Sequence, residues 1–200
     1  MSRGWILLIL ASCALGAWNW WQGRALPLPA GVEYAPDAPR QTPLSGKASP
    51  IVFGGYQLQP RANFQMTARL LRRERYHLGR EARIAPLDFA LGWGPMSDSA
   101  LLDRVQLRQS GRFYHVAWAD AALSADRILR NSANVHMIPA DATVARALNR
   151  MRPGHILRLD GLLVDVQGKD GWEWRTSLRR DDSGDGACEL FWVRLAHVIK

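Results

Sequence analysis

Two side chains have the types needed for nucleophilic catalysis, a thiol and an imidazole. Cys188 has no second cysteine in residues 51–200 with which to form a disulfide. His136 ends the polar sequence 132–136, whose hydroxyl and amide groups suit the orientation of a ring. A thiol beside an imidazole base is the arrangement of cysteine hydrolases. Because buried cysteine ordinarily behaves as a small apolar residue, we expect no enzyme and keep a thiol hydrolase using Cys188 and His136 as an alternative.

A second group of residues offers oxygen ligands of the kind that hard cations prefer. Asp181, Ser183 and Asp185, followed by Gly186, resemble the first half of a calcium loop of the EF-hand type. The twelfth position is Trp192 where such a loop has glutamate, and no flanking helix is predicted. We therefore interpret the segment as a polar hairpin tip and expect neither a metal nor a cofactor.

Aromatic and arginine side chains indicate a third chemistry, the stacking and phosphate contacts that bind single-stranded nucleic acid or sugars. Trp172 and Trp174 share one face of a predicted strand. Residues 61–83 hold seven arginines and two glutamates, which is five of the net charge of +8. The alternatives are core packing for the tryptophans and a solvated face for the arginines. The candidate binding residues are Trp93, Trp172, Trp174, Arg175, Arg69, Arg72, Arg73 and Arg75.

Composition limits the class of protein that positions these residues. The 200 residues are 48% hydrophobic and 22% charged, which excludes a disordered tail, a collagen-like chain and a disulfide-dense miniprotein. The length accommodates one ordinary domain with an appendage. No P-loop, dinucleotide-binding or nucleophile-elbow motif is present, and the five histidines show no metal-binding spacing.

The N-terminus predicts a membrane segment. Residues 5–21 carry no charge, and seventeen helical residues span about 26 Å, close to the roughly 30 Å hydrocarbon core of a bilayer. Tryptophans stand at both ends, as in an aromatic belt. We therefore assign residues 1–23 to a signal-anchor transmembrane helix with its N-terminus in the cytoplasm. A cleaved signal peptide and a lipoprotein signal ending at Cys13 are the alternatives.

Residues 24–50 form a predicted linker. Six of the eleven prolines fall here, and proline at this density disfavours helix and sheet and favours an extended polyproline spacer. At about 3.1 Å per residue this linker reaches up to roughly 80 Å. Residues 51–200 are then left as the extracytoplasmic domain.

The domain is predicted to be α+β and rich in strands. Apolar residues alternate over 64–70 and 172–178, and Asp141 is placed to cap a helix over 142–151. Over 155–167 the alternation changes phase at Gly161, which predicts a β-bulge there. This order of elements predicts a small, strongly bent β-barrel or sandwich in the C-terminal part, OB-like or SH3-like.

Three segments carry a resemblance to a known group. Residues 88–94, 132–140 and 174–178 resemble those of a group of uncharacterised bacterial membrane-anchored proteins. The resemblance covers most of residues 60–195. It implies a bacterial origin and a membrane anchor, and it implies no activity.

These patterns together predict a single-pass inner-membrane protein of the bacterial envelope. We expect its extracytoplasmic domain to be a binding or accessory module for an envelope partner, with residues 5–21 in contact with the membrane. The alternatives are an OB-type nucleic-acid-binding domain using the arginines of 61–83 and the thiol hydrolase named above.

Overall fold

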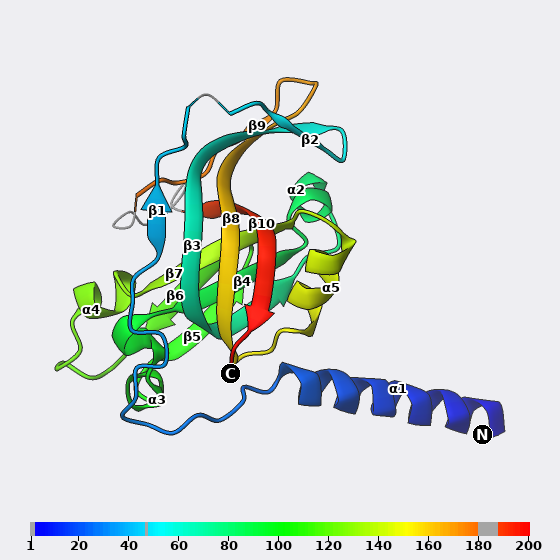
Figure 1. The fold of residues 1–200 in the computed structure, drawn as a ribbon. Coiled ribbons are helices and arrows are strands. Elements are labelled where there is room, and N and C mark those ends of the chain that lie inside the picture. Colours follow the sequence, from blue (N-terminus) through cyan, green and yellow to red (C-terminus); the bar gives the residue numbers. More distant parts are fainter. Residues whose placement is uncertain (1–2, 47, 180–187) are drawn as a thin grey trace.

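The computed structural model describes residues 3–46, 48–179 and 188–200 (Figure 1). Their side chains pack into one β-rich body from which a helix extends (Figure 1). The helices are α1 Arg3–Gly23, α2 Arg80–Ile84, η1 Gly94–Ser97, α3 Ser99–Leu102, α4 Ala125–Leu129 and α5 Ala142–Arg150. The strands are β1 Arg40–Thr42, β2 Ile51–Phe53, β3 Tyr56–Arg75, β4 Leu87–Gly92, β5 Gln106–Ser110, β6 Phe113–Ala117, β7 Ser132–Pro139, β8 Ile156–Gln167, β9 Glu173–Trp174 and β10 Glu189–Val198. The predicted α+β, strand-rich class is confirmed.

Five strands pair along a path that returns to its first strand. β3 pairs with β4, β4 with β7, β7 with β10, β10 with β8, and β8 again with β3. The β7–β10 pair is parallel and the other four pairs are antiparallel. One face of each strand contributes to the main core, which includes Phe64, Leu91, Met137, Leu157 and Phe191.

Helix α5 lies between β7 and β8 and covers the main core with Val144 and Leu148. Its start is fixed by the predicted cap. The Asp141 Oδ1 accepts hydrogen bonds from the backbone N–H of Thr143 at 2.7 Å and of Val144 at 2.9 Å. These two bonds satisfy N–H groups that the first turn of a helix leaves without partners.

The prediction of a β-bulge at Gly161 of β8 is wrong, because the bulge lies in the neighbouring strand β10. β8 runs unbroken through Gly161, and the extra residue lies opposite it in β10, where Arg194 falls between two paired positions. A Cβ at Gly161 would run into the Trp192 carbonyl, so the close pairing requires glycine. The apparent phase change arises because both faces of β8 are buried. Leu157, Leu159 and Leu163 face the main core, whereas Leu162, Val164 and Val166 face a second apolar cluster.

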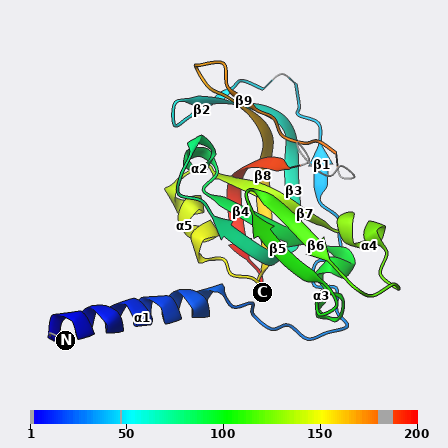
Figure 2. The same ribbon diagram turned by 180° about the vertical axis from the view of Figure 1, so that it is seen from behind.

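The second cluster lies on the other side of β7 and β10 from the main core. Ile138, Leu190 and Trp192 supply its floor. The far ends of β3 and β8 bend over this floor together with β2 and β9, as the views from front and back show (Figures 1 and 2). This bend brings loops from distant parts of the sequence to one end of the body.

The segment between β4 and β7 forms a separate layer. It contains η1, α3, the β5–β6 hairpin and α4, and it packs on the outer side of β3 and β4 through Leu71 and Ala90. Its own apolar residues in this third cluster include Met96, Leu101, Leu123 and Ile128. We call residues 93–131 the insertion.

The proline-rich segment follows the body closely, and we call residues 24–39 the strap. The Leu26 N–H donates to the Pro153 carbonyl at 2.8 Å, and the Gly94 N–H donates to the Ala35 carbonyl at 2.7 Å. Ala35 is fully buried. Beyond the strap, β1 pairs with β3, which corrects the expectation that this proline-rich segment contains no sheet. The three residues of β1 lie between Pro39 and Pro43, so their N–H groups remain able to pair.

Helix α1 forms over the predicted N-terminal segment and extends away from the body (Figure 1). The sequence predicts a transmembrane helix here. Within the part of the chain that the structure describes, however, we find no helix that combines the length and the apolar character needed to cross a membrane.

Candidate functional site

An open groove lies at the end of the body where β3 begins and β8 ends. Two adjoining cavities of about 320 and 390 Å³ share Gly55, Tyr56, Gly168 and Lys169. The β2–β3 turn forms one wall and the turn after β8 forms the other, because Gln57 pairs with Gln167. Gly54 and Gly55 both have positive φ, 56° and 88°, which the two-residue turn between Phe53 and Tyr56 requires.

Aromatic rings continue from this groove along one side of the body. The ring centroids of Tyr56 and Trp172 are 6.1 Å apart in an edge-to-face arrangement, and those of Trp172 and Trp174 are 6.2 Å apart. Both tryptophans are half-buried, so part of each ring remains accessible. The His136 ring follows, 4.9 Å from that of Trp174. Partly exposed aromatic rings of this kind stack with flat ligands.

The charges at the groove are mainly positive. The Arg80 guanidinium lies 5.0 Å above the Trp172 ring and bonds to Asp170 at 2.7 and 3.2 Å. These bonds lower the pKa of the Asp170 carboxyl below its ordinary value. Arg83 and Lys169 also line the groove, and neither forms an ion pair with any residue that the structure describes. The groove therefore has two cations available to an anionic ligand.

Behind the aromatic row lies a buried polar cluster built on Asp88. Its Oδ1 lies 2.8 Å from the His136 Nδ1 and accepts a 2.7 Å hydrogen bond from Arg112. The Arg112 guanidinium also stacks 4.0 Å above the Tyr76 ring. Within the described residues, the Asp88 Oδ2 has no hydrogen-bond partner. The cluster joins β4, β7 and the insertion through charge-assisted bonds.

A tight turn positions Arg112. Gly111 and Arg112 connect Ser110 and Phe113, which pair directly across the β5–β6 hairpin. Arg112 has φ of 73°, and it is the one non-glycine residue with positive φ among those that the structure describes. This left-handed conformation is unfavourable for arginine and is held here by the contacts of its side chain and by the Tyr76 hydroxyl, which accepts from its N–H at 2.9 Å.

The two candidate hydrolase residues, Cys188 and His136, lie near different parts of Arg112. The Cys188 thiol donates to the Arg112 carbonyl at 3.8 Å. The His136 Nδ1 faces Asp88, which binds the Arg112 side chain. The thiol and the ring thus lie at the same cluster, but these contacts do not join one to the other, and a Cys–His pair needs direct hydrogen-bond reach. We develop no hydrolytic mechanism from this arrangement.

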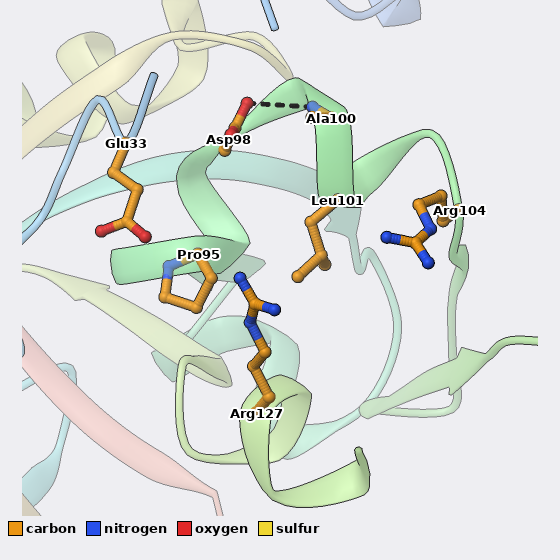
Figure 3. Close-up of a pocket in the computed structure, with 7 residues that line it drawn as sticks. All are labelled: Glu33, Pro95, Asp98, Ala100, Leu101, Arg104 and Arg127. Carbon is orange, nitrogen blue, oxygen red and sulfur yellow. Dashed lines mark hydrogen bonds between the residues drawn. The ribbon is translucent and has the colours of Figure 1, made fainter. Parts of the chain in front are cut away.

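A third cavity, of about 110 Å³, lies between the strap and the insertion (Figure 3). Figure 3 shows Arg127 and Arg104 extending toward it from two sides, with Glu33 of the strap opposite. Asp98 caps α3 by accepting from the Ala100 N–H at 2.9 Å and also accepts from the Gly31 N–H at 2.8 Å. Because two acids and two arginines line it and Asp98 binds the strap, we interpret this cavity as part of the contact between the strap and the insertion.

The structure separates the other predicted binding residues. Trp93 is buried in the main core, so it lines no groove. Arg69 is buried too and donates to the Ser97 carbonyl at 3.0 Å and the Ser99 hydroxyl at 2.9 Å. Arg175 pairs with Glu173 at 2.7 Å. These three residues serve packing or local pairing, in contrast to Trp172 and Trp174, which continue the groove.

The arginines of residues 61–83 do not form one basic surface. Arg61 pairs with Asp165, whereas Arg73 and Arg75 reach the C-terminal end of α5 and Arg72 is exposed elsewhere on β3. Only Arg80 and Arg83, of the arginines in this stretch, line the groove. The candidate calcium ligands Asp181, Ser183 and Asp185 lie outside the described residues.

Sequence reasoning missed several residues of the groove and cluster. Tyr56, Lys169, Asp88 and Arg112 were not among the candidates, and Arg80 and Arg83 were included only as members of the arginine stretch 61–83. The glycine pair before Tyr56 was a usable signal, because it marks a hairpin that presents the next side chain at an edge.

Comparison of the chain with protein-family profiles, curated proteins and solved structures finds no match.

Proposed function

We propose that this chain is a binding module held at a bacterial membrane by α1, and that its groove binds single-stranded nucleic acid. One observation carries the proposal. The groove combines the partly exposed rings of Tyr56 and Trp172 with the cations Arg83 and Lys169, which pair with no acid among the described residues. Rings that stack on bases and cations that follow phosphates are the two elements of sequence-tolerant strand binding.

The order of strand pairing supports an OB-type barrel over an SH3-like one. Counted in chain order (β3, β4, β7, β8, β10), the first of these five strands pairs with the second and fourth and the third pairs with the fifth, and α5 stands between the third and fourth. OB folds bind strands and sugars with the loops after their first and fourth strands. Here the loop after β3 carries Arg80 and Arg83, and the loop after β8 carries Lys169 and Trp172.

The face of β4 and β7, which OB folds also use, is occupied by the chain itself. The insertion packs on Ala90 of β4, and Arg112 reaches Asp88 beside it. Trp174 covers His136 of β7. A ligand is therefore left with the two loops and the groove between them.

The membrane location rests on α1. Residues 5–21 are uncharged, and the described side chains of this helix from Gly4 to Ala17 are exposed. We propose that these apolar side chains enter a membrane, with the N-terminus in the cytoplasm and the body on the extracytoplasmic face. An envelope protein partner is the alternative ligand for the groove.

Fluorescence anisotropy of a labelled oligothymidine, titrated with the full chain in mild detergent, tests the ligand. Trp172→Ala is expected to weaken binding about 5- to 150-fold, because stacking contributes about 1–3 kcal/mol per base. Replacing Arg83 and Lys169 by glutamine removes two phosphate contacts, so the slope of log affinity against log salt is expected to fall by about 1.4.

The matched control removes two arginines of the insertion, Arg104→Gln with Arg108→Gln, and leaves the groove intact. It is expected to keep the affinity and most of the salt slope. Absence of oligonucleotide binding at low salt, or equal losses in the groove and control variants, would refute the proposal. A cooperative thermal transition in each variant shows that the body remains folded.

A further inference from the structure

Helix α1 presents an apolar surface that the body does not cover. Leu7, Leu8 and Leu15 are 66%, 61% and 63% exposed. Apolar residues occupy all sides of the helix, so no single face is left for water. A continuous exposed apolar surface of this kind marks a site of contact with a membrane or another protein. The following inference rests on the part of the proposed function that places α1 in a membrane, and not on the groove.

The strap joins this helix to the body over a very short length. Two residues, Arg24 and Ala25, separate the end of α1 from Leu26, whose N–H bonds to Pro153. Gly154 has φ of 95° and lies so close to Leu26 that a Cβ there would meet its backbone. Front and back views both show α1 leaving the end of the body at which the chain's C-terminus lies (Figures 1 and 2).

Arginines gather at this same end, around the last turn of α5. Arg73 donates to the Asn149 carbonyl at 3.0 Å and to the Met151 carbonyl at 2.7 Å, and Arg75 bonds to the Asn149 side chain. Arg146 and Arg150 are exposed, and they stand one turn apart on the helix side that carries Asn149. We call Arg73, Arg75, Arg146, Arg150 and Arg152 the arginine face.

The described contacts of Arg73, Arg75 and Arg146 in the arginine face are with neutral groups. Among the described residues, Arg73, Arg75, Arg146 and Arg150 form no ion pair, and residues 142–155 contain no acid. The side chain of Glu74 belongs to the opposite face of β3, because side chains alternate along a strand, and in the register of β3 with β4 its backbone lies opposite Asp88. Burial, and then the neighbouring charge of Arg75, lower the pKa of Arg73, so Arg73 and Arg75 repel each other at this end of α5. An anionic surface would relieve that repulsion.

The face also lies next to the C-terminal end of the membrane-associated helix α1. Arg152 donates to the carbonyl of Arg24, the first residue after α1, at 3.5 Å. Both views place α5 on the side of the body below which α1 runs (Figures 1 and 2). Basic residues beside a membrane segment bind the acidic headgroups of the adjacent leaflet.

We propose that the arginine face binds anionic phospholipid headgroups of the bilayer that holds α1. The charge of the face, its neutral internal partners and its connection to the apolar helix all favour this occupant. Contact with the bilayer orients the body, with α5 toward the lipid and the groove at the other end of β8. The lipid class is defined by charge, so a phosphatidylglycerol bilayer is a sufficient probe.

Hydrogen–deuterium exchange of the full chain in lipid nanodiscs tests this contact. Exchange over residues 142–152 is expected to be slower in discs containing phosphatidylglycerol than in phosphatidylcholine discs, and high salt is expected to remove the difference. Arg146→Gln with Arg150→Gln is expected to weaken the contact roughly 30-fold and abolish the protection. Both side chains are exposed, and glutamine is a good helix former, so α5 is retained.

The control variant, Arg127→Gln with Arg130→Gln, removes two charges from α4 and is expected to keep the protection. Equal exchange in the two lipids overturns the proposal, as does protection that survives in the α5 variant. Failure of the full chain to assemble into discs also overturns it. Protection of the same residues by an oligonucleotide in phosphatidylcholine discs, without a lipid effect, reassigns the face to nucleic acid. None of these outcomes depends on ligand binding in the groove.

Discussion

Replacing Arg112 by alanine is expected to lower the free energy of unfolding by about 3–5 kcal/mol, because it leaves a buried carboxylate without its cation. The Asp88 side chain is 1% exposed and that of Arg112 is 18% exposed, so water replaces little of the lost bond. The variant also loses the stacking of the guanidinium on Tyr76 and its bond to the Ala85 carbonyl. Alanine retains the unfavourable positive φ, so the substitution relieves no backbone strain.

Asp88→Asn in the Arg112→Ala background separates the destabilisation caused by the unpaired carboxylate from that caused by the lost packing of Arg112. Once the cation is gone, neutralising Asp88 removes the uncompensated charge, so the double variant is expected to be more stable than the sum of the two single effects predicts. A coupling free energy of about 1–3 kcal/mol is the expected range for residues in direct contact.

Urea unfolding of the full chain in mild detergent, followed by tryptophan fluorescence, gives each value by linear extrapolation. Arg130→Ala is the control. It breaks an ion pair with Asp126 on α4 whose side chains are 61% and 69% exposed, and a change of about 0.5 kcal/mol or less is expected. A coupling below about 0.5 kcal/mol, with an unchanged dependence on urea, would show that Asp88 and Arg112 do not form the buried pair described here.

Two further predictions concern α5 and the loop after it. Asp141→Ala removes the acceptor of two N–H groups and is expected to cost about 1 kcal/mol in the same urea assay; an unchanged midpoint would contradict the cap. His155 accepts from the Arg152 N–H at 3.0 Å through Nδ1, so its neutral ring is the form that fits. Burial, and then Arg152, lower the pKa of His155 from 6.5. The unfolded chain therefore binds more protons as pH falls below 6.5, and stability is expected to decrease there. His155→Gln is expected to flatten that decrease, and an unaltered pH profile would refute the assignment.

Local signals predicted the elements that depend on nearby residues. Asp141 and the apolar spacing after it gave the start of α5, because a cap and its helix lie within a few residues. The alternation over 64–70 predicted part of β3 for the same reason. β8 was assigned a bulge because sequence alternation assumes one solvent-facing side, and this strand has apolar clusters on both.

The site depended on pairings that no local pattern contains. Asp88 and Arg112 are 24 residues apart and meet through a positive-φ turn in a hairpin that packs back on β4. Tyr56 and Lys169 share a groove because β8 pairs along its whole length with residues 57–69 of β3. Trp93 is flanked by two glycines, which indicate a turn, and it is buried in the main core. The residues of a turn do not indicate which of its sides the rest of the chain covers.

The attachment of the strap at Pro153 has a consequence for the height at which the groove operates. Leu26 lies three residues beyond the end of α1, so the body begins within about 11 Å of the helix instead of at the end of a long spacer. The twelve residues of β8 then span at most roughly 40 Å from that attachment to the groove. With α1 in a membrane, as proposed, these two lengths keep the groove within roughly 50 Å of the bilayer, so a strand that we propose it binds must pass within that height.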